Sequence, residues 1–171
     1  MRFGTNTLIT IRTFLPEDKD PILALLKETD VFTEEEIGVA TELMDVFLHD
    51  HKQKDYDIYT ALADQTEVVG YLCIGRTPLT HGTFDLYWLA VKPSYHRSRV
   101  GKQLLQHAEH VVKSNSGRLL LTETSSQPNY EKTRTFYIKN EYSEVARIKD
   151  YYKIGDDLVI YGKYLSQQKG S

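Results

Sequence analysis

The sequence has 171 residues, of which 40% are hydrophobic and 26% are charged, and its formal net charge is −3. This length and composition predict one folded domain over 8–165, followed by a disordered tail at 166–171. The small negative charge excludes a global field that would attract nucleic acid or an anionic membrane, and no apolar stretch approaches the roughly 20 residues that span a bilayer. Cys73 is the single cysteine and lies in an apolar run, and no secretory signal is visible. We therefore expect a buried thiol and a cytoplasmic protein without disulfides.

The first elements are one strand and two helices. Near-alternation of apolar and polar residues over 8–14 indicates the strand, and an acidic turn with two prolines at 16–21 opens the first helix. Thr33 stands three residues before Glu36, which is a capping-box pattern. Apolar residues then recur at three- and four-residue spacing, so the second helix is expected to end near His49.

The remaining elements alternate strands with two further helices. Runs of apolar and β-branched residues predict strands at 58–63, 68–74, 83–91, 118–123, 142–148 and 158–165, and helical periodicity predicts helices at 101–113 and 129–139. The segment 83–123 is then a βαβ crossover. These elements predict an α+β fold in which a mixed, mostly antiparallel central sheet is flanked by helices.

A basic loop joins the strand 83–91 to the next helix. Arg97, Arg99 and Lys102 place three cations where that helix opens at Gly101. The start of a helix exposes unpaired N–H groups and a partial positive charge, so this pattern is suited to an anion such as a pyrophosphate. The alternative is that the three cations only keep the loop solvated, and the charge pattern alone leaves both interpretations open.

The same segment resembles motif A of the GNAT superfamily of acyl-CoA-dependent N-acetyltransferases, which reads Gln/Arg-x-x-Gly-x-Gly/Ala at the start of a helix. The corresponding residues are His96-Arg97-Ser98-Arg99-Val100-Gly101. Gly101 matches the last glycine, whereas His96 and Arg99 replace the first residue and the first glycine. The preceding Leu-Ala-Val-Lys-Pro and the following Lys-Gln-Leu-Leu are also typical of that family.

A second segment extends the resemblance over nearly the whole chain. The passage from Phe136-Tyr137 to Tyr142 is similar to the family's helix-to-strand passage, Phe-Tyr-x-x-x-Gly-Phe/Tyr. Glu141 stands where that glycine is usual, and we expect Asn140 to take the left-handed conformation in its place, since asparagine tolerates a positive φ.

The resemblance implies acetyl-CoA as co-substrate and no metal. The pantetheine arm would lie between the strands 83–91 and 118–123, where main-chain groups placed by the sheet can pair with its amides. Tyr130 holds the position of an asparagine that contacts pantetheine in the family. The implied contacts with the cofactor are therefore Leu89, Ala90, Val91 and Tyr130 along the arm, and His96, Arg97, Ser98, Arg99, Val100, Gly101 and Lys102 around the pyrophosphate.

The resemblance also implies acetyl transfer to an amine. Tyr137 occupies the position of the tyrosine that family members direct at the thioether sulfur, and a phenol is a competent proton donor to a thiolate. The alternative is that Tyr137 is a core aromatic. Asp85 and Glu123 are the candidates for the general base, because family members recruit a carboxylate from these strands; each could instead be an exposed charge or a hydrogen-bond acceptor at a strand end.

The acceptor remains open between a small molecule and a peptide or protein. The tyrosine-rich, acidic connection Tyr151–Asp157, together with Asp150, either supplies carboxylates and aromatic faces for a cationic amine or is an exposed hairpin turn. A GNAT-like module that binds CoA esters without transferring acyl groups, in a regulatory or interaction role, is the alternative from another class. A phosphate-loop protein is disfavoured, because 101–103 lacks the Gly-Lys-Ser/Thr pattern.

We expect neither nucleic acid nor membrane as a partner, and a homodimer is compatible with the sequence. The four histidines at 49, 51, 107 and 110 are interpreted as surface or interface residues rather than metal ligands.

Overall fold

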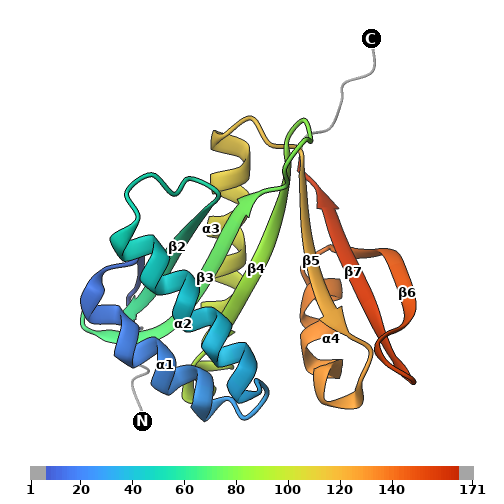
Figure 1. The fold of residues 1–171 in the computed structure, drawn as a ribbon. Coiled ribbons are helices and arrows are strands. Elements are labelled where there is room, and N and C mark those ends of the chain that lie inside the picture. The colour runs from blue at the N-terminus through green and yellow to red at the C-terminus, as the bar shows by residue number, and fades with distance from the viewer. Residues whose placement is uncertain (1–6, 166–171) are drawn as a thin grey trace. The chain divides into compact units, whose positions relative to one another are not determined.

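The structure, a computed structural model, describes residues 7–165, so the tail predicted at 166–171 lies outside the described residues. Within that range the elements are β1 (Ile9–Thr13), α1 (Lys19–Glu28), α2 (Glu34–His49), β2 (Tyr56–Ala63), β3 (Glu67–Arg76), β4 (Thr83–Val91), α3 (Val100–Ser114), β5 (Leu119–Ser125), α4 (Glu131–Lys139), β6 (Ser143–Lys153) and β7 (Asp156–Tyr164) (Figure 1). Short 3-10 turns precede α1, α3 and α4, at Pro16–Asp18, Pro93–Tyr95 and Pro128–Tyr130.

The strands form a sheet in the order β1-β2-β3-β4-β5-β7-β6. β1 pairs antiparallel with β2, and β7 pairs antiparallel with both β5 and β6. β4 and β5 are parallel, with Thr83–Leu86 opposite Leu119–Thr122, and α3 is the crossover between them. The predicted α+β fold with a mixed, mostly antiparallel sheet is therefore confirmed.

The chain divides into two compact units. Unit 1 holds the described residues up to Cys73 together with Trp88–Leu105, and unit 2 holds Ile74–Tyr87 together with the described residues from Gln106 onward. β3, β4 and α3 each pass from one unit into the other. The basic loop before α3 thus belongs to unit 1, whereas β5, α4, β6 and β7 belong to unit 2.

Unit 1 has its core between α1, α2 and strands of the sheet. The Thr33 hydroxyl accepts the Glu36 N–H at 3.2 Å and the Glu36 carboxylate accepts the Thr33 N–H at 2.7 Å, which confirms the predicted capping box. Burial raises the pKa of the Cys73 thiol to about 12, as a buried side chain requires. The fully or nearly fully buried side chains of this core include Phe14, Ile22, Leu25, Leu26, Met44, Ile58, Tyr71 and Cys73.

Unit 2 has its core between α4, the second part of α3 and the strands β5 and β7. Tyr137 of α4 stacks on Tyr161 of β7 with ring centroids 6.1 Å apart. The apolar stripe predicted for α3 is buried along its whole length, in both units, at Leu104, Leu105, Ala108, Val111 and Val112. The periodicity of the sequence therefore identified the correct face of this helix.

The chain between α4 and β6 differs from the prediction. Glu141 has φ 70°, whereas Asn140 has φ −101°, so the left-handed conformation expected at Asn140 is wrong. Asn140 stays at the helix end because its backbone N–H and its side-chain amide both donate to the Phe136 carbonyl oxygen, at 3.2 Å and 2.8 Å. The reversal of the chain falls one residue later, at the position where the family has glycine.

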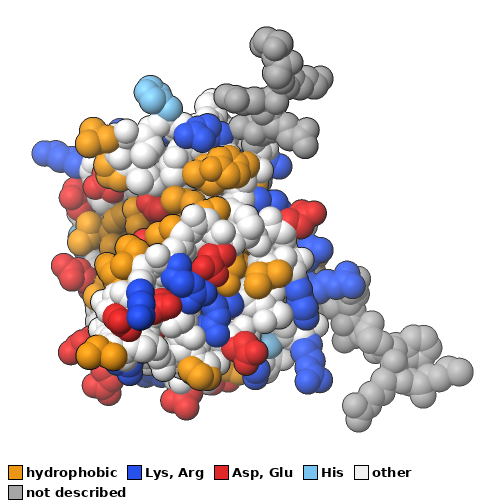
Figure 2. Space-filling view, turned by 90° about the vertical axis from the view of Figure 1, so that its right-hand side faces the viewer, with side chains coloured by type: hydrophobic (Ala, Val, Ile, Leu, Met, Phe, Trp, Pro, Cys, Tyr) orange, Lys and Arg blue, Asp and Glu red, His pale blue; other side chains and the backbone are white. Residues whose placement is uncertain are grey.

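The strand β6 is longer than the predicted 142–148 and lies at the edge of the sheet. All 11 of its residues are exposed, and its register with β7 is irregular at two places. Figure 2 shows the face that carries β6, with exposed hydrophobic side chains interspersed with acidic and basic ones. Bulges and charges of this kind protect an edge strand against pairing with another chain. No helix between residues 7 and 165 is both long and apolar enough to cross a membrane.

Candidate active site

The basic loop of unit 1 is held in place by contacts at its start. Glu67 of β3 accepts hydrogen bonds from Lys92 Nζ and Tyr95 Oη, each at 2.7 Å. His96 contacts the Val91 carbonyl oxygen through Nε2 at 2.9 Å, and since a carbonyl can only accept, this nitrogen carries the proton. The backbone N–H of His96 bonds within the same turn, to Pro93. The Nε2–H group and the backbone N–H of His96 are therefore both engaged in shaping the loop.

Arg99, which stands at the position of the first glycine of the motif, has a left-handed backbone. Its φ is 60°, in the left-handed region that favours glycine, and its carbonyl oxygen accepts the Gln103 N–H that starts α3. The N–H groups of Val100, Gly101 and Lys102 are thus the unpaired donors of the first helical turn. The loop thus opens α3 through a left-handed residue, although that residue is an arginine.

The cations of this loop are uncompensated within residues 7–165. The side chains of Arg97, Arg99 and Lys102 are exposed, and none of them forms an ion pair with a described residue. Ser98 is exposed beside them. Three unpaired cations at a helix start, where the backbone also presents donors, fit a multiply charged anion.

The first turn of α3 packs directly on β3. A Cβ added to Gly70 would come within 2.9 Å of both the Ala90 carbonyl oxygen and Leu104 Cδ1. The Ala90 carbonyl is thus on the β3 side of β4. The Lys92 N–H also bonds to β3, through the Val69 carbonyl oxygen. Because the backbone groups of successive strand residues point to opposite edges, those of Leu89 and Val91 belong to the other edge of β4.

Tyr137 of unit 2 is buried within a group of aromatic rings. Its exposed fraction is 5%, and its ring lies 5.7 Å from that of Tyr142 and 5.3 Å from that of Phe136. Its hydroxyl receives a hydrogen bond from Thr122 Oγ1 of β5 at 3.2 Å. Burial raises the pKa of Tyr137, and the bond from Thr122 acts in the opposite direction. A protonated phenol is thus secured at this position at neutral pH.

Glu123 and Asp85 lie on the opposite face of the same part of the sheet. The register places Asp85 beside Leu121, and alternation then puts Asp85 and Glu123 on one face and Thr122 on the other. The pKa of Glu123 is raised, first because it is partly desolvated and then because of the negative charge of Asp85. Asp85 itself accepts a hydrogen bond from Thr77 Oγ1. Of the two candidates, Glu123 has the environment that favours proton uptake.

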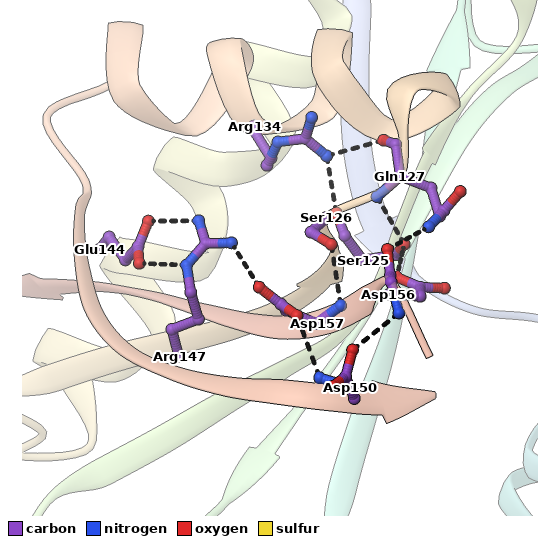
Figure 3. A network of polar contacts seen from close by, with 10 residues as sticks. Ser125, Ser126, Gln127, Arg134, Glu144, Arg147, Asp150, Asp156 and Asp157 are labelled. Atoms are coloured by element: carbon purple, nitrogen blue, oxygen red, sulfur yellow. Dashed lines mark hydrogen bonds and ion pairs between the residues drawn. The ribbon is translucent and has the colours of Figure 1, made fainter. Parts of the chain in front are cut away.

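A network of polar contacts ties the loop between β5 and α4 to the β6–β7 hairpin (Figure 3). Arg134 donates to the carbonyl oxygens of Ser125 and Gln127, at 2.7 Å and 2.9 Å. Ser125 Oγ donates to Asp156, and Ser126 Oγ accepts the Asp157 N–H at 2.8 Å. These contacts fix the start of α4, and hence the position of the helix that carries Tyr137.

The acidic connection 150–157 is a hairpin whose carboxylates are already paired. Asp150 accepts the Gly155 N–H at 2.7 Å, and Asp157 accepts from Arg147 at 3.0 Å. The Asp156 carboxylate is bonded to Ser125. Of the two interpretations left open for this segment, the geometry favours the turn, because its carboxylates support the hairpin. Its tyrosines remain exposed, at 56% for Tyr151 and 50% for Tyr152.

Tyr130 lies at the start of α4 and belongs to the surroundings of Tyr152. Burial raises the pKa of Tyr152 to about 12, with further contributions from Glu123, Asp156 and Tyr130. The structure thus brings Tyr130, Tyr152 and Glu123 into one neighbourhood of unit 2. The contact of Tyr130 with pantetheine stays a prediction.

The histidines show no arrangement typical of a metal site. Among the described residues, no group of three or more His, Cys, Asp or Glu side chains could hold a metal ion. His49 Nδ1 bonds to the Asp45 carbonyl oxygen at 2.8 Å. The pKa of His107 is lowered, mainly by burial and also by His110.

Three residues that matter to this geometry were absent from the sequence-based prediction. Thr122 holds the hydroxyl of Tyr137, and Glu67 holds the basic loop. Arg134 holds the start of α4. Thr122 directly precedes the predicted base, and strand alternation placed it on the opposite face. No local pattern marks Glu67 or Arg134, because their partners lie 25 to 28 residues away or are backbone carbonyls.

The comparisons with known proteins agree with this geometry. The model of the Acetyltransferase (GNAT) domain family matches residues 54–144, more than half of the chain, and this range contains β4, the basic loop, α3, β5 and α4. No curated protein matches the sequence. The chain belongs to the GNAT acetyltransferase family.

Solved structures share the fold over almost the whole chain. A protein assigned to the GNAT acetyltransferases of Desulfovibrio desulfuricans is 38% identical, with a TM-score of 0.89 over 93% of this chain and 100% of that one. An aminoglycoside 6′-N-acetyltransferase complexed with coenzyme A has 19% identity and a TM-score of 0.72, covering 94% and 99% of the two chains. A ribosomal-protein alanine N-acetyltransferase from Escherichia coli has 15% identity and the same TM-score, covering 96% and 99%. The last two show likeness of fold alone.

Proposed function

We propose that this chain is an N-acetyltransferase that moves an acetyl group from acetyl-CoA to a primary amine of a small molecule, peptide or protein, by direct attack in a ternary complex. The observation that carries the proposal is the loop before α3. It keeps a left-handed backbone at Arg99 in place of the family's glycine and presents three uncompensated cations beside the free N–H groups of a helix start.

The residues of this loop fit the pyrophosphate of acetyl-CoA. The backbone of Val100, Gly101 and Lys102 would donate to it, and the side chains of Arg97, Ser98 and Arg99 would add charge and a hydroxyl. His96 supports the loop from within, through its bond to Val91. Leu89 and Val91 offer backbone groups on the edge of β4 away from β3, where the amides of pantetheine could pair with them.

Acetyl-CoA supplies an acetyl group activated as a thioester. Glu123 takes a proton from the ammonium form of the acceptor, so that the amine nitrogen can form the new C–N bond. Tyr137 gives its hydroxyl proton to the sulfur as the C–S bond breaks. The nitrogen loses its second proton as the amide forms, and an equivalent proton returns to Tyr137, whereas the proton on Glu123 leaves to solvent. The net products are therefore the amide, the CoA thiol and one proton. Partial desolvation and, after it, the charge of Asp85 raise the pKa of Glu123, which suits a base that works near neutral pH.

The acceptor class follows from the same chemistry. Two structural neighbours are an aminoglycoside N-acetyltransferase and a ribosomal-protein alanine N-acetyltransferase, and the acceptors that these names specify are both amines. Glu123 and Asp85 on one sheet face favour the approach of a cationic ammonium group. We therefore propose an amine as the acceptor of this chain and name no single compound.

Thermal melting with acetyl-CoA tests the cofactor assignment. At about 100 times the dissociation constant, the ligand should raise the free energy of unfolding by roughly 2.7 kcal/mol, which is roughly 5–10 °C in Tm for a chain of this size. Free CoA should give a shift of the same kind and compete. A melting curve unchanged by millimolar acetyl-CoA would remove the proposal.

The second candidate is a module that binds CoA esters without transferring the acetyl group. The replacement of the first motif glycine by Arg99 favours it, whereas the buried, hydrogen-bonded Tyr137 favours catalysis. Both candidates predict the same thermal shift, so they are separated by turnover and not by binding.

A further inference from the structure

The hydroxyl of Tyr137 has a single hydrogen-bond partner among the described residues. Thr122 Oγ1 donates to it at 3.2 Å, and the two side chains are only 3% and 5% exposed. A phenol oxygen that accepts one hydrogen bond from a fixed donor has its own O–H directed elsewhere. The threonine therefore selects the direction in which Tyr137 can donate.

The rings packed against Tyr137 hold it in place, and the hydroxyl of Tyr142 is engaged elsewhere. Tyr142 donates its hydroxyl to Glu109 at 3.2 Å, and Lys163 lies 3.0 Å from the same carboxylate. The ring of Tyr161 is stacked on Tyr137 at an interplanar angle of 23° and fixes its plane. The aromatic rings hold the ring of Tyr137, and Thr122 holds its oxygen.

We propose that Thr122 is a positioning residue for Tyr137, whose hydroxyl it orients so that the phenolic proton points away from β5 toward the acyl-CoA sulfur. The inference rests on the proposed role of Tyr137 as general acid. After Tyr137 has given up its proton, the bond from Thr122 is made to a phenolate, and a hydrogen bond to a charged oxygen is stronger than one to a neutral oxygen. Thr122 thus stabilises the state that the proton transfer creates, and it contacts no reacting atom.

The substitution Thr122→Val tests this, because it removes the hydroxyl and keeps the shape. We expect kcat to fall roughly tenfold, which corresponds to about 1.4 kcal/mol of lost transition-state stabilisation, with KM for acetyl-CoA and its thermal shift unchanged. Thr122→Ser and Thr122→Ala form a second pair that differs in the oxygen only. The serine variant should keep kcat within about threefold of the parent, and the alanine variant should show the loss.

Thr124→Val is the matched control. Thr124 lies two residues along the same face of β5 and is equally buried, and its hydroxyl has no partner among the described residues. The same change of oxygen to carbon there breaks no hydrogen bond with a described residue. Its kcat should equal that of the parent.

A double-mutant cycle distinguishes the two proposals. In a Tyr137→Phe background Thr122→Val should cause no further loss of kcat, because the group through which it acts is gone. Equal losses in both backgrounds, or parent kcat in Thr122→Val and Thr122→Ala, would overturn the role of Thr122 while leaving that of Tyr137 intact. Parent kcat in Tyr137→Phe alone would overturn both.

Discussion

Replacing Arg99 by glycine should change stability and cofactor affinity in opposite directions. A non-glycine residue at φ 60° carries a left-handed strain of about 1–2 kcal/mol, and glycine adds about 0.4–1 kcal/mol of freedom to the unfolded chain. The Arg99→Gly protein without ligand should therefore be about 0.5–1 kcal/mol more stable, which is a rise in Tm of roughly 1–4 °C.

The Arg99→Gly protein should bind acetyl-CoA more weakly than the parent. A hydrogen bond to a charged group contributes about 1.5–3 kcal/mol, and the exposure of Arg99 argues for the lower end. The dissociation constant for acetyl-CoA should thus rise roughly tenfold by calorimetric titration. Glu141→Gly is the control, because Glu141 also has a positive φ but lies outside the loop; it should gain stability and keep its affinity. If Arg99→Gly binds acetyl-CoA as tightly as the parent, the arginine has been wrongly placed at the phosphates.

Three other substitutions probe the loop, its support and the pH dependence of stability. Gly101→Glu places a negative charge at the start of α3, and the thermal shift with acetyl-CoA should largely disappear; an undiminished shift would show that the anion binds elsewhere. Gly70→Ala would press a methyl group to 2.9 Å from the Ala90 carbonyl oxygen, so the free energy of unfolding should fall by about 1–3 kcal/mol in urea titration, and a neutral result would contradict that close approach. Burial would by itself raise the pKa of Asp18, but hydrogen bonds, led by that from Arg12, lower this pKa overall. The ionised Asp18 therefore stabilises the fold above the unfolded pKa near 4, and this stabilisation is lost as the pH falls below that value. Urea titrations of Asp18→Asn should show a weaker acid dependence of stability than those of the parent.

The sequence predicted the elements well because each carries a local signal. The capping box at Thr33, the proline that ends β4 and the apolar stripe of α3 act within a few residues, and all three stand in the structure as expected. The extent of β6 was underestimated, since its whole length is exposed and no apolar alternation marks it. The prediction for Asn140 was wrong because a contact with Phe136 holds this residue at the end of the helix.

The site was predictable only where the motif is contiguous in sequence. The loop 96–102 and Tyr137 were identified by resemblance, and no local rule indicates that an arginine will adopt a left-handed φ. Thr122 and Glu67 were missed because their roles depend on pairing between distant segments. Substrate contact was one of two interpretations left open for the carboxylates at 150–157. The sequence could not decide between them, because it does not show which charges are paired within the fold.

The release of free CoA from acetyl-CoA in the presence of an amine panel tests the central claim most directly. The panel should contain aminoglycosides, polyamines and peptides with free N-termini, and thiol release should be followed for the parent and for Tyr137→Phe. The account predicts amine-dependent release by the parent and a value of kcat lower by roughly 10²–10⁴-fold in the variant, with acetyl-CoA still bound. A parent protein that binds acetyl-CoA but releases no CoA with any amine would contradict catalysis and support the binding module.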